Sequence, residues 1–210
     1  MREKILYLSL FLSILLASTV ITALSAKEQD NAVMEAWLVA KAYDSNGNLL
    51  WKIEKKDPLT LNFGRWLSLF LCPGSCSINP TDTGGTARTV TRGSAAAGVS
   101  PLGPYDLKIV VGTGTTAFSV NNYALASQVQ SATASAPTIS IIGNKANVSI
   151  SASFTFSSAT TITEIGYIIY EDQYNYAYSY LFAREVLGTA KAVPAGGQLT
   201  VTWILRINQG

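Results

Sequence analysis

Histidine is absent from this chain of 210 residues, and cysteine occurs only twice. Because histidine is the commonest general base and metal ligand near neutral pH, its absence excludes the usual Ser-His and Cys-His catalytic arrangements. Two cysteines without histidine supply only half of a zinc site. With no acid–base or metal constellation visible, the sequence predicts a protein that is not an enzyme and that carries no cofactor.

Charge is also scarce, since charged residues make up 13% of the chain and the formal net charge is +2. No basic stripe is present to neutralise phosphates, so nucleic acid is not an expected partner. Ser, Thr, Gly, Ala and Asn replace the usual Lys and Glu, a composition typical of β surfaces outside the cell. The length fits one domain plus a targeting segment.

Residues 1–25 have the layout of a secretory signal peptide. A short basic start precedes an uncharged, mostly apolar run over residues 5–21, and Ala23 and Ser25 are the small residues of a cleavage site. We therefore expect export, cleavage near Ala26, and contact with a membrane only through the leader. A retained membrane anchor is the alternative, because the run is nearly long enough to span a bilayer.

The two cysteines, Cys72 and Cys76, are separated by Pro-Gly-Ser. Export would place them in an oxidising compartment, and Pro-Gly supplies the tight turn that a small ring needs, so the spacing predicts a disulfide. Such a ring removes little chain entropy and would hold a local loop rather than the whole fold. Free or reactive thiols remain the alternative.

A β-hairpin is expected near the start of the mature chain. Residues 32–43 and 49–54 are predicted strands, and the Asn-Gly pair between them is the strongest short-range hairpin signal. Asp44, Asn46 and Asn48 in this turn also allow a calcium loop as an alternative. They lack the remaining ligands and the distant bidentate Glu of such loops.

One helix is predicted to begin at Asp57-Pro58, because Asp is a good N-cap and Pro is favoured at the first helical position. It runs to Leu71 and is apolar on nearly every side, which is typical of a helix buried against a sheet. Docking to a membrane or partner is the alternative, although Arg65 is its only cation.

The segment that follows, residues 72–104, is rich in Gly, Ser, Thr, Pro and Ala. We expect a long loop, of the kind used for function or assembly, with one strand over 86–92. Residues 106–111 predict a buried strand, and residues 123–129 a short helical turn.

The C-terminal half predicts β-structure throughout. Residues 147–157 and 199–207 alternate apolar and polar side chains, the pattern of strands with one buried face. Two more strands are expected over 161–170 and 181–187. We therefore predict, over residues 26–210, a single all-β domain: an antiparallel β-sandwich of jelly-roll or immunoglobulin-like type with one short buried helix.

Two motifs have an ordinary structural interpretation. Gly112–Thr116 superficially resembles a phosphate loop but lacks the Lys, so a turn is expected. The carboxylates Glu164, Glu171, Asp172 and Glu185 are expected to be solvated or salt-bridged surface charges rather than a hydrolytic pair.

Tyr174, Tyr176 and Tyr178 lie in a polar context, where tyrosine suits surface contacts and glycan stacking. Aromatic packing at a hairpin edge is the equal alternative. Asn147 begins an Asn-Val-Ser sequon on the polar face of a predicted strand, which indicates an N-glycosylation site in an exported protein.

Several ordered segments from Leu107 onward resemble a module of phage structural and fibre-associated proteins: IVVGTGTTAFSVNNYALASQV, TITEIGYIIY, LFAREVL and GGQLTVTWIL. The earlier stretch AYDSNGNLLWKIEKKDPLTLNFGRWL resembles the start of such proteins. This resemblance implies a structural role and transfers no catalytic residue. Virion parts are not normally exported by a secretory leader. The leader with a Ser/Thr-rich β domain instead resembles subunits of archaeal threads and bundling pili, in which an N-terminal segment of one subunit completes the sheet of the next.

The leading hypothesis is therefore a subunit of an extracellular filament or pilus, a homopolymer assembled by strand complementation. Residues 26–39 are the candidate donor, with Met34, Ala36 and Leu38 on one of its two apolar faces. An ordinary first strand of the same domain explains the pattern equally well. A monomeric adhesin that binds surface glycans or other cells through its tyrosines, or a virion fibre-type protein, is the alternative function.

Overall fold

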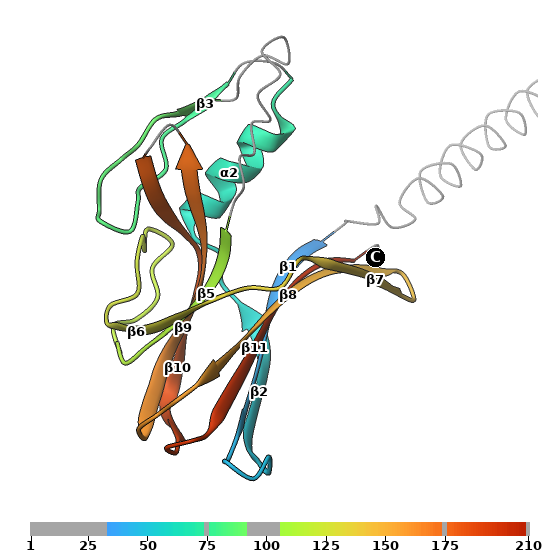
Figure 1. The fold of residues 1–210 in the computed structure, drawn as a ribbon. Coiled ribbons are helices and arrows are strands. Elements are labelled where there is room, and N and C mark those ends of the chain that lie inside the picture. The colour runs from blue at the N-terminus through green and yellow to red at the C-terminus, as the bar shows by residue number, and fades with distance from the viewer. Residues whose placement is uncertain (1–32, 74–75, 92–105, 174–175, 209–210) are drawn as a thin grey trace, which may run out of the picture.

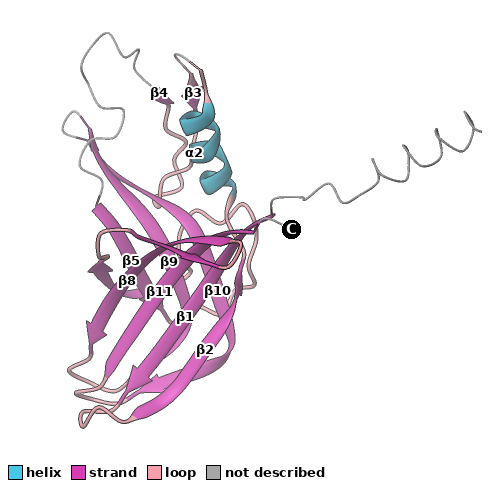
Figure 2. Ribbon diagram, turned by 90° about the vertical axis from the view of Figure 1, so that its right-hand side faces the viewer, coloured by secondary structure: helices cyan, strands magenta, loops and turns pink. Residues whose placement is uncertain are grey.

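The computed structural model describes residues 33–73, 76–91, 106–173 and 176–208. Two antiparallel sheets pack face to face, and a single helix stands at one end of them in the described part (Figures 1 and 2). The predicted all-β sandwich with one short helix is confirmed. The predicted signal peptide and its cleavage site lie outside the described residues.

Five strands form sheet A in the order β2-β1-β11-β8-β7, and four form sheet B in the order β10-β9-β5-β6. The strands of sheet A are β1 (Val33–Tyr43), β2 (Leu49–Asp57), β7 (Thr138–Ile142), β8 (Lys145–Thr155) and β11 (Gln198–Asn208). Those of sheet B are β5 (Asp106–Gly112), β6 (Gln128–Thr133), β9 (Thr160–Gln173) and β10 (Tyr176–Val193). Helix α2 (Leu61–Leu71) leads to a small two-stranded sheet of β3 (Ser77–Ile78) and β4 (Val90–Thr91).

The core lies between the two sheets and follows the period-two pattern of the strands. Leu38, Phe154 and Val201 point inward from sheet A, and Ile109 and Ile165 meet them from sheet B, each at most 1% exposed. Each such side chain contributes roughly 1.5–3 kcal/mol through the area it removes from water. Alternation in β8 and β11 therefore correctly predicted the residues buried between the sheets, but Ile207 at the end of β11 is exposed and Asn147 on the polar face of β8 is buried.

Strand β1 lies inside its own domain's sheet. It pairs with β11 on one side and with β2 on the other, so that Leu38 has both Trp203 and Lys55 as neighbours. Leu38 is fully buried and Ala36 is 8% exposed. This contradicts the donor-strand interpretation for Ala36 and Leu38, because both edges of β1 and its inner face are already occupied within one chain.

Helix α2 begins later than Asp57-Pro58. Asp57 is the last residue of β2, and Leu59 forms an isolated bridge with Ala183 of β10. The Thr60 amide then donates to the Phe182 carbonyl oxygen at 2.9 Å. Pairing with β10 keeps this segment extended, so the helix starts at Leu61 with Thr60 as its N-cap.

Only one face of α2 is buried. Trp66 and Leu69 pack toward Tyr180 and Phe182 of β10, whereas Leu71 is 73% exposed. Phe70 and Leu61 are also exposed. The prediction of burial against a sheet is correct for this one face.

Two other local predictions are wrong. Residues 123–129 form no helical turn, because the chain there is a loop that leads into β6. The strand expected over 86–92 is present only as Val90–Thr91. Strands β6 and β7 were not predicted at all.

Candidate assembly surface

One end of sheet A extends beyond the cover of sheet B. In Figure 1 the ends of β1, β8 and β11 project with β7 to the right of the sandwich. The cross-strand registers align two apolar rows there, on the face that continues the core. We call these eight residues the apolar extension: Met34, Ile207, Ala146 and Ile141 in one row, and Ala36, Leu205, Val148 and Ile139 in the next.

The row that begins at Met34, and both residues of the apolar extension on β7, are open to solvent. Met34 is 42% exposed and Ile207 37%, whereas Ile139 and Ile141 on β7 are 75% and 78% exposed. Leucine, isoleucine and methionine side chains exposed singly are common on soluble proteins, but a contiguous group on one sheet face indicates a contact surface.

An apolar cavity of about 160 Å³ adjoins the extension. Leu205, Trp203 and Ile150 form its floor from sheet A, with Phe63 of α2 and Leu107 of β5 among its walls. Tyr167 also lines it, and burial raises the pKa of that phenol, so its hydroxyl stays neutral. The cavity and the extension together form a continuous apolar groove along sheet A.

Strand β7 is a free edge. Its residues pair with β8 through Thr138–Ser149 to Ile142–Lys145, and no other described strand pairs with it. All five of its residues are exposed, and none is charged. Edge strands usually carry charge, proline or a bulge against unwanted pairing.

The opposite edge of sheet A, β2, shows that usual protection. Lys52, Glu54 and Lys56 are exposed along it. Lys52 pairs with Glu54 at 2.7 Å, and Lys56 pairs with Glu35 of β1. The chain therefore protects one edge of sheet A with charge and leaves the other apolar and free of charge.

The residues of β7 were missed by sequence reasoning. The available signal was the short β-branched run Thr138–Ile142 followed by the Gly143-Asn144 turn and the clear strand β8. That combination predicts a hairpin. What no local pattern shows is that the strand lies at an edge with its apolar side chains uncovered.

Asn147 lies on the other face of sheet A. Its side-chain oxygen accepts a hydrogen bond from Arg206 Nε at 3.0 Å, and the residue is 6% exposed. The Arg206 guanidinium also stacks over the Trp37 ring at 4.7 Å. This packing does not fit the predicted glycosylation site, because a glycan on Asn147 would have to displace Arg206.

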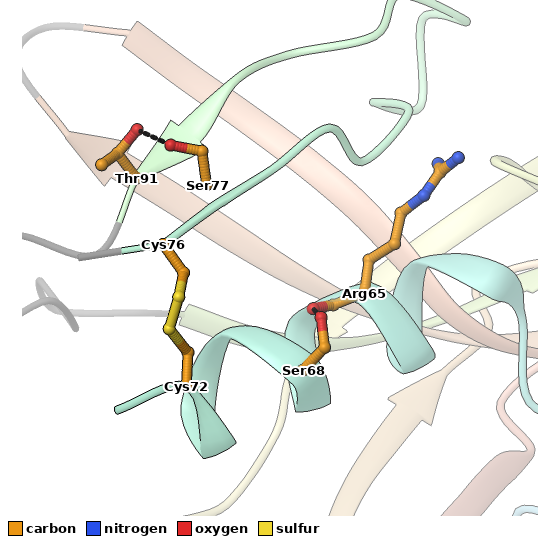
Figure 3. Close-up of a disulfide and its surroundings, with 6 residues drawn as sticks. All are labelled: Arg65, Ser68, Cys72, Cys76, Ser77 and Thr91. Carbon is orange, nitrogen blue, oxygen red and sulfur yellow. Dashed lines mark hydrogen bonds between the residues drawn. A yellow bond between two sulfur atoms is a disulfide. The ribbon is translucent and has the colours of Figure 1, made fainter. Parts of the chain in front are cut away.

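The predicted disulfide is present. Cys72 follows α2 and Cys76 precedes β3, with their Cα atoms 6.3 Å apart, and Figure 3 shows the bond linking the helix end to the small sheet. In that sheet the hydroxyls of Ser77 and Thr91 share a hydrogen bond of 2.7 Å (Figure 3). The bridge therefore fixes a local corner, as the small ring predicts.

Only part of the predicted tyrosine contact surface lies within the described residues. Tyr174 and the side chain of Tyr176 lie outside the described residues. Tyr178 is half-buried beneath the Arg88 guanidinium, which lies 4.2 Å from the ring centroid. Arg88 is held in turn by Asp82, at 2.7 Å from Nε to Oδ2. Tyr178 thus fits the alternative interpretation, aromatic packing at a hairpin edge.

The Asp44 carboxylate organises the β1–β2 turn. It accepts hydrogen bonds from the backbone amides of Asn46 and Asn48 and from the Asn48 side-chain amide, at 2.8–2.9 Å. The bonds from Asn48 are the main reason that the pKa of Asp44 lies below its usual value. The carboxylate is therefore satisfied without calcium, and the described residues hold no cluster of three or more acidic, His or Cys side chains suited to a metal.

Glu164 was expected at the surface but is fully buried. Arg184, 1% exposed, pairs with it at 2.8 Å, and the amides of Gly114, Ala126 and Ser127 donate to its two oxygens at 2.7–3.0 Å. The tight turn predicted at Gly112–Thr116 is not present, because Gly112 ends β5 and the Thr113 amide still donates to the Ser127 carbonyl oxygen at 2.9 Å. The two glycines of this segment are explained by the contact with Glu164. A Cβ on Gly114 would lie 2.4 Å from Glu164 Oε1.

Glu185 is also buried, contrary to its predicted surface position. Lys55 donates to it at 2.6 Å, and Asp57 lies beside it. Burial, and then the charge of Glu185, raises the pKa of Asp57 to about 9. The side chains of Glu171 and Asp172, also expected at the surface, lie outside the described residues.

No protein-family model, curated protein or solved structure matches the chain. In the described part of the chain, no helix is long and apolar enough to cross a membrane. The site must therefore be interpreted from its own geometry.

Proposed function

We propose that this protein is a structural subunit of an extracellular assembly and that it associates with copies of itself through the apolar extension. The observation that carries the proposal is the pair of aligned apolar rows that sheet B leaves open, ending at the highly exposed Ile139 and Ile141. Contiguous apolar patches of this kind on a soluble domain mark surfaces that a partner covers.

The proposal keeps assembly through strand pairing, but it places the contact at the apolar extension and β7 instead of at residues 26–39. Strand β1 stays within its own domain, between β2 and β11. The groove along sheet A and the free edge of β7 provide the surface that a neighbour covers. Location outside the cell rests on the leader of residues 1–25 and agrees with the Cys72–Cys76 disulfide.

The buried polar groups support a structural role over a catalytic one. Both carboxylate oxygens of Glu164 are held by backbone amides and Arg184, so this buried acid fixes the chain between β5 and β6 to β9. The adhesin alternative has less support, because Tyr178 packs against Arg88 instead of presenting a free ring.

Light scattering and electron microscopy of the mature protein test the proposal. We expect particles larger than one chain that grow with protein concentration. The Ile139→Lys/Ile141→Lys variant should stay monomeric with the same circular dichroism spectrum, because both side chains are already exposed in the single chain. A folded, unmodified protein that remains monomeric at every concentration contradicts the proposal.

A further inference from the structure

We propose that β7 pairs with β7 of a second copy, antiparallel and around a two-fold axis at Ser140, so that two sheets A join into one. This deepens the proposed function and rests on it. The free outer edge of β7 carries backbone N–H and C=O groups that no described strand satisfies, and a second strand satisfies them.

The sequence of β7 is complementary to itself in this register. With Ser140 opposite Ser140 of the second copy, Ile139 lies opposite Ile141, and Thr138 opposite Ile142. Side chains on directly opposed residues share a face. Ile139 and Ile141 therefore meet isoleucines on the face of the apolar extension, and Ser140 meets serine on the other.

The pairing also makes the two apolar extensions continuous. On one copy, Ile141 ends the row that runs through Ala146 and Ile207 to Met34. In the proposed register it meets Ile139 of the second copy, which begins the row through Val148, Leu205 and Ala36. The two five-stranded sheets would form one ten-stranded sheet with unbroken apolar rows.

Charge favours a second copy as the occupant. No residue of β7 is charged, so self-pairing places no like charges opposite each other. Lys145, the nearest cation, neighbours Ile142 on β8. In the proposed register that row continues into Thr138 and Ser149 of the second copy, so the two lysines lie in different rows.

A lipid surface fits less well, because hydrocarbon would leave the edge groups of β7 without hydrogen-bond partners.

A pair of five-residue strands buries less than the roughly 1,200 Å² typical of stable interfaces, so we expect a weak dimer that a covalent trap can capture. A two-fold contact closes on itself, so a filament would use this dimer as its repeating unit and need a second contact.

Cysteine trapping tests the register. Single variants Thr138→Cys, Ser140→Cys and Ile142→Cys each add one thiol, because Cys72 and Cys76 are already bonded. Opposed residues in antiparallel strands have Cα atoms about 4.5–5.5 Å apart, within the range of a disulfide. Two copies of residue 138, or of residue 142, would lie about 13 Å apart.

We therefore expect Ser140→Cys alone to form a dimer on non-reducing gels under mild oxidation. Thr138→Cys and Ile142→Cys should link only when mixed, at least about tenfold more than either alone, since a pair 13 Å apart cannot bridge. Lys52→Cys, on the charged β2 edge of the same sheet, is the matched control and should not link.

A second measurement separates this contact from self-association in general. Ile141→Lys should weaken the dimer about tenfold or more, because a charge would enter an apolar row without a partner. Leu49→Lys alters another exposed apolar residue of sheet A, 56% exposed on β2, and should leave the dimer unchanged.

Each outcome decides a different point. Self-linking at all three positions would mean parallel pairing and overturn the proposed register. Self-association that no β7 cysteine traps would overturn the β7 contact but leave the proposed function standing. A monomer throughout would overturn both. A monomer that binds phosphatidylcholine vesicles and loses this binding with Ile141→Lys would assign β7 to lipid and overturn the inference.

Discussion

Asp57 shows how strongly a single position depends on its surroundings. As the last residue of β2 it is 6% exposed, and among the described residues no N–H or O–H group donates to its carboxyl oxygens, whose side-chain contact is with the carboxylate of Glu185. Glu185 of β10 lies beside it and pairs with Lys55, whose charge only partly offsets the effect of burial and of Glu185 on Asp57. Neutralising Asp57 by protonation is the simplest way to bury it there.

The pKa of Asp57 makes stability depend on pH. The folded state keeps this proton up to about pH 9, whereas the ordinary value of 3.8 applies when the chain unfolds. Between these pH values the folded state binds one proton more, so the free energy of unfolding falls as pH rises. The slope is at most about 1.4 kcal/mol per pH unit.

We therefore expect the melting temperature to fall from pH 4 to pH 9, and Asp57→Asn to flatten that dependence. Thermal unfolding followed by circular dichroism measures both. Glu54→Gln, which alters an exposed carboxylate on the same strand, is the control and should keep the slope of the unmodified protein. Equal slopes in the unmodified protein and Asp57→Asn would contradict the assignment.

The Glu164–Arg184 pair gives a second prediction for individual residues. Arg184→Met should destabilise the domain by about 3–5 kcal/mol, because it leaves Glu164 buried with its charge uncompensated. Adding Glu164→Gln to that variant should recover part of the loss. Urea unfolding measures both variants, and a double variant as unstable as the sum of the two single changes would argue against coupling.

Among the elements, α2 combines a buried and an open face. Trp66 and Leu69 attach it to β10, and the Cys72–Cys76 bridge ties its end to β3. Figure 3 shows the Arg65 side chain extending away from the helix, well apart from the bridge at the helix end. The helix is therefore held by its apolar stripe along its length and by the bridge only at its end.

The double variant Cys72→Ser/Cys76→Ser should consequently lower the free energy of unfolding by about 2 kcal/mol or less, given the small ring. The β signal in circular dichroism should be unchanged. Hydrogen exchange should increase at the end of α2 and in β3, while amides of β8 and β11 keep their protection. Loss of protection across both sheets would show that the bridge supports the whole fold.

For the whole molecule, the position of β1 decides which substitutions unfold the protein. Leu38→Asp would place a charge in the core, where the side chain is fully buried, and should abolish the β signal. Met34→Asp, on the same face of the same strand but 42% exposed, should leave the monomer folded. A folded Leu38→Asp monomer would restore the donor-strand interpretation.

Local sequence patterns were enough to predict several strands, one hairpin and the disulfide of this protein. The Asn-Gly turn predicted the β1–β2 hairpin, and period-two alternation predicted β8, β11 and the side chains that they place between the sheets. Pro-Gly spacing predicted the disulfide, whereas the tight turn predicted at Gly112–Thr116 is absent because Gly112 belongs to β5. These features depend on neighbours within a few residues, which the sequence places side by side.

Only the tertiary structure decided which of these surfaces are covered. Alternation in β1 could not distinguish a donor from a central strand, because both bury two faces and differ only in whose strands lie beside it. From the sequence, Glu164 looks like a surface acid and Asp57 like a helix N-cap, until β10 supplies Arg184 and Glu185. In the same way, β7 became a candidate contact surface because sheet B leaves the end of sheet A open. Burial and edge position arise from contacts between residues far apart in the chain, and a local sequence pattern cannot show such contacts.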